Sequence, residues 1–436
     1  MTDADILIIG AGAAGLMAAR TLAKSGKKVT VLEARDRVGG RIHTLEYGSS
    51  QQPLEMGAEF IHGDLPVTQC LLDEAGITYH HATASMWRYD DGDFKNDGSF
   101  VEHWDLLIDK LNALQQDTNI SAFLIEEFKG DEYQGLRESV RKYVSGYDNA
   151  DPKKASAFSL RKEWQCEDEN AQYRIEGGYI RLVKFMADEL VQAGGNIYLN
   201  AVARDIDWQQ HQVKITTDAG ITYTGEQLLI ALPLGVLQAG KDAIGTVNLN
   251  PPIPVYINAI NTLGFGAVIK VLLEFDKAFW ETMETETLPV GSLENMGFLF
   301  SEEQIPTWWT QIPNHTTLLT GWLGGPEASE KVETPDEEIL LQSLQSLGNI
   351  FKRNPQQLKD SLLSWHVVNW TADKYTRGSY AYDTVEANQS RNILCEPVQD
   401  TIFFAGEYLY EGTAMGTVEA ALTSGLRMAE RILDFK

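Results

Sequence analysis

Apolar residues near the start of the chain follow two different spacings. A continuous apolar run at 6–9 leads into a glycine-rich turn, then into apolar positions spaced as on one face of a helix through residue 24, and then into a second, mainly apolar run at 29–32. A short apolar run bounded by glycine predicts a buried strand, and the wider spacing predicts a helix. Strand, helix and strand in this order predict a unit of a parallel sheet.

The same spacings recur farther along the chain. The pattern predicts further strands at 196–199, 213–216, 221–223, 227–232, 269–275 and 317–322. It predicts further helices within 106–128 and at 180–190, 336–351 and 417–433. Gly194 and Gly195 mark the end of one helix, and Pro233 stops one strand. Strands alternating with helices predict an α/β fold, with room for more than one domain in 436 residues.

The first turn carries the spacing G-x-G-x-x-G at Gly10, Gly12 and Gly15, and Glu33 follows 18 residues later. The first glycine permits a tight turn, the second lets the backbone approach a pyrophosphate, and the third lets helix and strand pack closely. A helix beginning near Ala11 would point its free N–H groups at the phosphate, and Glu33 would accept hydrogen bonds from the ribose. We therefore predict a dinucleotide site; the alternative is a structural glycine turn.

The loop after Glu33 indicates which dinucleotide binds. Its glycines, Gly39 and Gly40, let the backbone run beside a flat ligand, and Arg41 offers a planar fork to a phosphate or a ring carbonyl. The stretch E-A-R-D-R-V-G-G-R at 33–41 resembles the flavin amine oxidase superfamily, which includes monoamine oxidases, polyamine oxidases, histone lysine demethylases and L-amino acid oxidases. The resemblance implies FAD; the alternative is an NAD site followed by an ordinary basic loop.

The resemblance also implies a fold that is both α/β and α+β. A discontinuous Rossmann-type FAD-binding domain would comprise 1–82, 172–247 and 381–436, and a substrate-binding domain of mixed sheet and helices would comprise 83–171 and 248–380. The segment 83–171 carries no recognisable chemical motif, and its implied role is to line the substrate cavity.

Residues 57–63 resemble the family segment G-A-x-W-x-H-G, which passes along the flavin and borders the substrate pocket. Phe60 takes the aromatic position and His62 matches the pocket histidine. Glu59 departs from the small residue expected there. One hypothesis is that Glu59 and His62 hold a distal cationic nitrogen of a polyamine.

Three residues carry the catalytic roles that the resemblance implies. Lys270 stands in G-F-G-x-x-x-K-x-x-x-x-F, like the family lysine that holds a water beside flavin N5 and assists the oxygen reaction. Trp370 and Tyr380 match W-x-x-D-x-x-x-x-G-S-Y, which places both rings against the flavin. The alternatives are an outward-facing lysine and a core aromatic cluster. Ser379 replaces the flavin-linking cysteine of monoamine oxidases, so we expect FAD to bind non-covalently.

A second signature begins at Phe404 and includes Glu407, which matches the family acid near the FAD ribityl chain. Thr413 replaces a second cage tyrosine and is assigned to the substrate pocket, and Val202 matches the valine beside the adenine. Spacing and resemblance together assign cofactor contacts to Gly10, Gly12, Ala14, Gly15, Glu33, Ala34, Arg35, Gly39, Gly40, Arg41, Gly57, Ala58, Glu59, Val202, Trp370, Gly406, Glu407, Thr413 and Ala414.

Charge and cysteine content indicate which binding partners and which compartment to expect. With 36 Lys and Arg against 62 Asp and Glu, the formal net charge is −26, which disfavours nucleic acid and anionic membranes. Such a field draws in a cationic substrate, or it serves solubility alone. Cys70, Cys166 and Cys395 give no disulfide framework, no zinc spacing is present, and we expect no metal. With no spanning apolar run and no basic leader, we expect a cytoplasmic location.

The implied activity is oxidation of the C–H bond alpha to an amine nitrogen. Hydride would pass to flavin N5, and an imine or aldehyde and hydrogen peroxide would form, with molecular oxygen as acceptor. An L-amino acid oxidase is an alternative that needs a carboxylate-binding arginine, for which Arg88, Arg174 and Arg377 are candidates. A non-catalytic flavin-binding protein is the alternative from another class. The sequence leaves the amine and the oligomeric state open.

Overall fold

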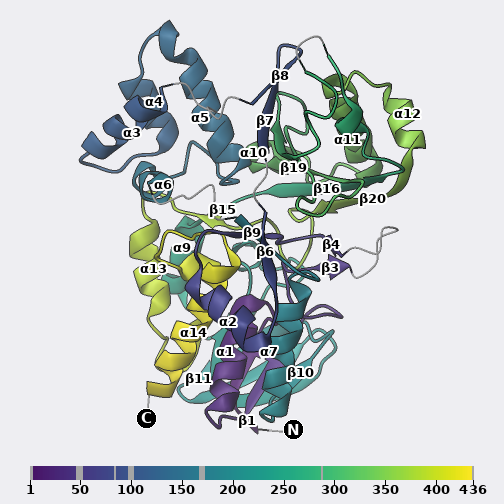
Figure 1. The fold of residues 1–436 in the computed structure, drawn as a ribbon. Coiled ribbons are helices and arrows are strands. Elements are labelled where there is room, and N and C mark those ends of the chain that lie inside the picture. The colour runs from purple at the N-terminus through teal and green to yellow at the C-terminus, as the bar shows by residue number, and fades with distance from the viewer. Residues whose placement is uncertain are drawn as a thin grey trace.

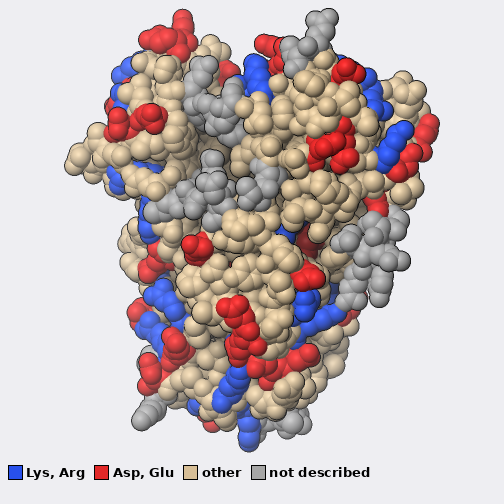
Figure 2. Space-filling model, viewed as in Figure 1, with Lys and Arg blue, Asp and Glu red and all other residues tan. Residues whose placement is uncertain are grey.

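The computed structural model describes residues 3–45, 53–82, 85–96, 103–165, 172–285 and 288–434. Cys166 therefore lies outside the described residues. A lower part contains both ends of the described chain, and the upper part divides into a helical lobe and a sheet lobe (Figure 1). In the space-filling view, acidic and basic side chains are interspersed over this face, on both upper lobes and below them (Figure 2).

An eight-stranded sheet forms the centre of the lower part. Its order is β10-β2-β1-β13-β12-β11-β14, and β22 also pairs with β13. The strands are β1 (Asp3–Ile9), β2 (Val29–Leu32), β10 (Asn196–Tyr198), β11 (Ala203–Gln209), β12 (Gln212–Thr217), β13 (Thr222–Ile230), β14 (Asn248–Asn250) and β22 (Ile402–Phe404). β10, β2, β1, β13 and β22 run parallel, and β12 is antiparallel to both of its neighbours.

Helices cover both faces of this sheet at β1, so residues 6–9 of this strand are apolar on both sides. Ile6 and Ile8 belong to the core shared with α1 (Ala13–Lys24), α7 (Ile180–Gln192) and α14 (Val418–Asp434). Leu7 and Ile9, which point to the opposite face, belong to the core shared with α9 (Pro254–Thr262) and α13 (Ala387–Cys395). This two-sided burial confirms the predicted strand–helix–strand unit, although α1 begins at Ala13 and not near Ala11.

The sheet lobe of the upper part is built on seven strands in the order β20-β16-β19-β18-β17-β7-β8. They are β7 (Ser85–Asp90), β8 (Asp93–Lys95), β16 (Val268–Phe275), β17 (Met296–Phe300), β18 (Thr307–Trp309), β19 (Leu318–Gly324) and β20 (Leu362–Asn369). The helices α10 (Gly325–Glu330), α11 (Asp336–Ile350) and α12 (Pro355–Asp360) complete this lobe, and its core includes Val271, Trp308 and Leu344. The predicted elements 269–275, 317–322 and 336–351 are confirmed within a residue or two.

The helical lobe consists of α3 (Trp104–Ala113), α4 (Ile120–Glu127), α5 (Gln134–Gly146) and α6 (Ala157–Trp164) around a separate apolar core. The remaining strands are β3 (Thr44–Leu45), β4 (Leu54–Glu55), β5 (Phe60–His62), β6 (Tyr79–His81), β9 (Gln172–Ile175), β15 (Gly264–Phe265) and β21 (Ala381–Tyr382). The remaining helices are α2 (Pro66–Ala75) and α8 (Leu234–Leu237), with short 3₁₀ turns at Asp131–Tyr133, Phe279–Thr282 and Glu407–Leu409.

The lower part extends beyond the predicted boundary at residue 247. β14 belongs to its sheet, and Ala259 and Ile260 of α9 belong to its core. The division into two domains stays a prediction. Residues 248–263 pack with the lower part, which contains the segments predicted to bind FAD. None of the described helices is long and apolar enough to cross a membrane.

Candidate active site

One cavity of about 880 Å³ connects the lower sheet with both upper lobes. Its lining begins at Gly10 and Glu33, at the carboxyl ends of β1 and β2, and continues to Tyr143 of α5 and Trp322 of β19. The carboxyl ends of parallel strands are where α/β folds bind dinucleotides, because the following helix presents free N–H groups there. The position of the cavity therefore follows from the topology.

The glycines of the first turn keep this end of the cavity open. A Cβ on Gly15 would lie 2.0 Å from the carbonyl oxygen of Gly10, so only glycine allows α1 to pack this closely. A Cβ on Gly12 would meet only the oxygen of Gly39, at 4.0 Å, so its hydrogen faces space that a ligand can use. The two glycines thus have different tasks, as the spacing predicts.

Glu33 stands at the same end. Its carboxylate accepts hydrogen bonds from the backbone N–H groups of Ala11, at 2.8 Å, and Arg35, at 2.9 Å. Burial raises the pKa of Glu33, and the two N–H donors partly oppose this effect. The side chain is thereby fixed at the wall of the cavity, which Val202 also lines.

Two arginines are held by carboxylates along the middle of the cavity. Arg41 donates from Nη1 to Glu407 Oε1, at 2.9 Å, and to the carbonyl oxygen of Ser379, at 2.5 Å. Arg35 donates to both carboxylate oxygens of Asp373, at 2.5 and 3.0 Å. These ion pairs join the N-terminal loop to the C-terminal third of the chain, so residues more than 330 positions apart form one wall.

The segment at Gly57 brings two predicted catalytic side chains together. Trp370 donates its indole N–H to the carbonyl oxygen of Met56 at 2.9 Å, and the Lys270 ammonium donates to that of Gly57 at 3.1 Å. A Cβ on Gly57 would lie 1.8 Å from the carbonyl oxygen of Arg41, so glycine is required here.

Lys270 occupies the middle of β16, which pairs with β19 on one side and β20 on the other. Its side chain is 1% exposed and lines the cavity. The alternative of an outward-facing lysine is therefore excluded. A buried ammonium is costly without a partner, and Lys270 donates to Glu59 Oε2 at 2.5 Å.

Glu59 is the centre of a cluster of charges. Its carboxylate also accepts hydrogen bonds from the indole N–H of Trp309, at 3.0 Å, and from the Arg174 guanidinium. Burial by itself would raise the pKa of Glu59, but Lys270 and Arg174 together hold it at about 2. The cluster therefore contains one anion and two cations.

Tyr380 packs against Gly416, whose φ of +70° favours glycine, and donates its hydroxyl to the carbonyl oxygen of Tyr147. Burial, together with the negative charges of Asp148 and Glu163, raises the pKa of Tyr380 well above its usual range. The tyrosine is therefore a neutral hydrogen-bond donor.

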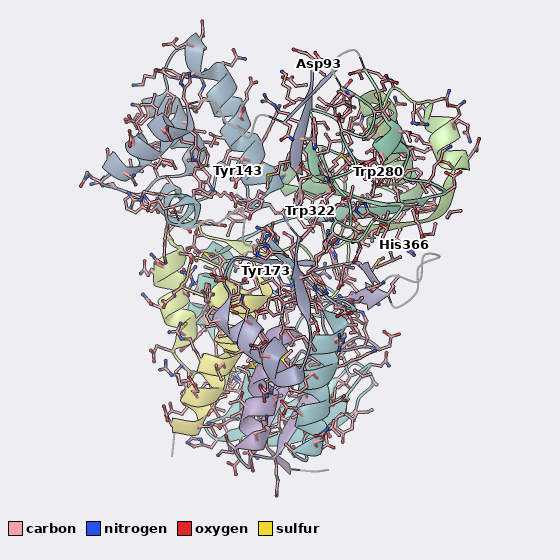
Figure 3. The ribbon with its side chains drawn as sticks, viewed as in Figure 1. Asp93, Tyr143, Tyr173, Trp280, Trp322 and His366 are labelled. Carbon is pink, nitrogen blue, oxygen red and sulfur yellow. The ribbon has the colours of Figure 1, made fainter. Side chains whose placement is uncertain are left out.

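Aromatic side chains from both upper lobes complete the chamber around these residues. Figure 3 shows Tyr143 of the helical lobe and Trp322 of the sheet lobe near the level where the two lobes meet. Trp322 donates its indole N–H to the carbonyl oxygen of Gly146 at 2.9 Å, which ties the lobes together. The other aromatic lining residues include Phe60, Tyr147, Phe298, Phe300 and Trp309.

A smaller pocket of about 210 Å³ adjoins this chamber and shares His62, Tyr147 and Tyr380 with it. Its lining is acidic and includes Asp64, Asp148, Glu163 and Asp383. Asp383 forms an ion pair with Arg391.

The cavity brings most of the predicted site residues together. Those that line it are Gly10, Gly12, Ala14, Glu33, Ala34, Arg35, Gly39, Gly40, Arg41, Gly57, Ala58, Glu59, Phe60, His62, Val202, Lys270, Trp370, Tyr380, Gly406 and Glu407. Gly15 packs behind the turn, and Thr413 and Ala414 line the smaller pocket instead. The roles assigned to all of these residues, as contacts of the cofactor or the substrate, stay predictions.

Several lining residues were missed from the sequence. They include Ala231, Leu232, Pro233, Val236, Tyr375, Thr417, Val418, Ala421 and the aromatic residues Tyr143, Tyr147, Phe298, Phe300, Trp309 and Trp322. Pro233 offered a usable signal, because it marks the carboxyl end of the parallel strand beside β1. The aromatics offered none, since aromatic residues are equally frequent in cores.

Fold and cavity define a dinucleotide-dependent oxidoreductase with its reaction chamber between two upper lobes. Residues 13–433 match the family model described as flavin containing amine oxidoreductase. The chain belongs to this family, and its cofactor is FAD. The residues fit that cofactor, because Gly12 leaves room for a pyrophosphate, Glu33 is fixed at the ribose end, and the cavity continues from there to Lys270.

Known proteins from several subgroups resemble the chain. It is 27% identical over 462 residues to human lysine-specific histone demethylase 2, covering 99% of this chain and 53% of that protein. It is 28% identical over 467 residues to polyamine oxidase 2 of Arabidopsis thaliana, covering 98% and 87%. The chain spans about half or less of the demethylases that it matches.

Solved structures share the fold over nearly the whole chain. A putrescine oxidase bound to putrescine superimposes with a TM-score of 0.80 at 21% identity, covering 99% of each chain. Cyclohexylamine oxidase from Brevibacterium oxydans gives a TM-score of 0.78 at 20% identity, covering 99% of each chain. At these identities the likeness establishes the fold alone.

Proposed function

We propose that the protein oxidises the C–H bond alpha to the nitrogen of a diamine or polyamine, with molecular oxygen as acceptor. The imine is hydrolysed by water to an aldehyde and ammonia or a shorter amine, and oxygen is reduced to hydrogen peroxide. The observation that carries the proposal is the single cavity that joins the dinucleotide turn to the chamber of Lys270, Trp370 and Tyr380. Bound FAD supplies the two-electron acceptor. Because Ser379 stands where a flavin-linking cysteine would be needed, we expect FAD to be held non-covalently.

The charges around the chamber support a neutral amine at the reacting carbon. The two cations Lys270 and Arg174 outnumber the one anion Glu59, so this wall disfavours a further positive charge on the substrate nearby. Aromatic walls such as Phe60, Tyr147 and Trp309 hold an alkyl amine by apolar contact and exclude water. The substrate nitrogen therefore loses its proton more easily here than in solution.

The smaller pocket supports a substrate with a second, charged nitrogen. Asp148 and Glu163 lie beyond Tyr380 in that pocket, where they favour an ammonium. We place the distal nitrogen there and not at Glu59, because the Glu59 carboxylate already pairs with two cations, Lys270 and Arg174. Relatives include a polyamine oxidase and a structure of putrescine oxidase with putrescine, which agrees with this substrate class.

An L-amino acid oxidase is the second candidate, supported by Arg88 in the lining of the cavity. Of the three candidate arginines, Arg174 and Arg377 are not among the residues that line it. Arg174 is bound to Glu59 and Gln311, and Arg377 donates to the carbonyl oxygen of Ile244.

The test is a peroxide-coupled screen of the FAD-loaded protein against spermine, spermidine, putrescine, N-acetylated polyamines, aromatic amines and L-amino acids. We expect diamines or polyamines to give the highest kcat/KM. Preference for L-amino acids would favour the second candidate, and flavin-loaded protein that oxidises none of them would favour a non-catalytic flavin-binding protein.

A variant of the smaller pocket tests the placement of the distal nitrogen. Glu163→Gln removes one negative charge, so we expect KM for a polyamine to rise about tenfold and KM for a monoamine of similar length to change little. Equal changes for both substrates would contradict this placement.

A further inference from the structure

Glu59 occupies an unusual position for a carboxylate, because it faces the lysine that the proposed oxidase needs. Its side chain is 4% exposed, and Lys270 approaches one oxygen at 2.5 Å while Trp309 approaches the other at 3.0 Å. The negative charge of this carboxylate is already matched by two cations, Lys270 and Arg174. The geometry therefore favours a task within the protein.

Arg174 holds Glu59 from behind the cavity. Its guanidinium donates to Glu59, to Gln311 Oε1 at 3.0 Å and to the carbonyl oxygen of Thr310 at 2.9 Å. It also stacks on the ring of Phe60, with 4.2 Å between the guanidinium carbon and the ring centroid. Four contacts fix this arginine, so the carboxylate that it binds has one position.

The ammonium of Lys270 is aimed by the same arrangement. Within the described part of the chain, its N–H groups donate to Glu59 and to the carbonyl oxygen of Gly57. An ammonium has three N–H groups, so these two bonds leave one for a group in the cavity that Lys270 lines.

We propose that Glu59 is a positioning residue that keeps Lys270 charged and directed at the flavin, with Arg174 and Trp309 holding Glu59 in turn. This inference rests on the proposed function. In a buried site an ammonium without a counter-charge loses its proton readily, whereas an ammonium bound to a carboxylate retains its proton. Glu59 thereby supplies the counter-charge for the ammonium beside the flavin.

Other titratable groups near Lys270 must be separated from this effect. Glu55 of β4 is coupled electrostatically to Lys270, and burial raises its pKa to about 7. His62 of β5 and Arg174 of β9 are coupled to Glu59, and burial lowers the pKa of His62. Glu55 is the group that could titrate near neutral pH, so the test includes a variant of it.

The test compares Glu59→Gln with wild-type holoenzyme in kcat/KM for oxygen from about pH 6 to about pH 9. We expect a flat profile in the wild type. In the variant we expect a loss of about tenfold at the alkaline end, with recovery toward pH 6 as Lys270 regains its proton. Glu59→Asp should restore the flat profile in part, because it keeps the charge. Glu55→Gln combined with Glu59→Gln should show the same acquired dependence as Glu59→Gln.

A second readout does not depend on turnover. The midpoint potential of bound FAD should fall more steeply with pH in Glu59→Gln than in the wild type, because reduction then draws a proton onto Lys270. Arg174→Gln is the matched control: it removes a buried partner of Glu59 but leaves the pair with Lys270, so its potential should keep the wild-type slope.

Two results would overturn the inference. The first is a Glu59→Gln variant in which the midpoint potential keeps the wild-type dependence on pH and kcat/KM for oxygen stays flat. The second is an effect of Glu59→Gln that is limited to the KM of polyamines, which would indicate that Glu59 binds the substrate. Failure of the proposed function alone would give a different result. The protein would oxidise no amine, but the midpoint potential of its bound FAD would still depend more steeply on pH in Glu59→Gln than in the wild type.

Discussion

The two ends of the cavity are built in different ways. At the dinucleotide end, the wall of the cavity is formed mainly by turn glycines, and backbone N–H groups fix Glu33. These residues lie within 5–41. At the chamber end, charged side chains come from separate segments: Lys270 and Glu59 are 211 positions apart, and Glu59 and Arg174 are 115 positions apart. One end is defined by a contiguous turn, and the other only by the tertiary fold.

This difference predicts how each end responds to mutation. A backbone site fails when added atoms fill the space for the ligand, whereas a charge cluster fails when one member leaves the others unpaired. The variants below separate these two kinds of failure.

The largest effect is expected at the chamber end. Lys270→Met should lower kcat/KM for oxygen by about 100-fold or more, because it removes a preorganised positive charge from the reaction site. Reduction of the flavin by amine under anaerobic stopped flow should change much less. Lys270→Arg, which retains the charge, is the control. Equal losses in both half-reactions would show that the residue supports structure alone.

The next effect is expected at the dinucleotide end. Gly12→Val should weaken FAD binding by at least about tenfold and leave the melting temperature of the FAD-free protein unchanged, because its side chain enters open space. Gly15→Ala should lower that melting temperature, since its Cβ meets the Gly10 carbonyl. Calorimetric titration with FAD and thermal melts of the FAD-free protein measure both. An unfolded Gly12→Val variant would contradict the account of this turn.

The smallest effect concerns Glu55, which accepts hydrogen bonds from Thr44 Oγ1 and the Tyr179 N–H, both at 2.7 Å. Burial raises its pKa from 4.5 to about 7. A raised folded pKa means that the stabilisation is complete below the unfolded pKa and is lost as pH rises through 7. Glu55→Gln should therefore raise the melting temperature relative to wild type by about 3 °C at pH 8, and by less at pH 5. The same difference at both pH values would reject the assigned shift.

The sequence predicted the dinucleotide end well because its information is local. Turn glycines, an apolar strand and an acid at this spacing seldom occur together outside a dinucleotide site. The C-terminal helix and the strands β1, β2, β12, β16 and β19 were also predicted, since their apolar spacing is regular, but β7, β8, β14, β17, β18 and β20 were not. The helical start at Ala13 was missed by two residues, because Gly12 still has an extended backbone as the helix cap.

The chamber could be predicted only in part. The family resemblance implied the side chains of Lys270 and Trp370, but not the ion pair of Lys270 with Glu59, because this pairing across 211 positions depends on how β16 packs against the segment that leads into β5. The same limit applied to Arg174, which was considered as a carboxylate binder and is held by Glu59, Gln311 and Thr310. Charge patterns in sequence do not show which partners meet.

The central claim is that one flavin lies along the whole cavity, with its ring at Lys270, Trp370 and Tyr380. A crystal structure of the FAD-loaded protein tests it most directly. The account predicts the adenosine end at Gly12 and Glu33, and all three side chains within about 5 Å of the flavin ring. A ring more than about 10 Å from these side chains would contradict it.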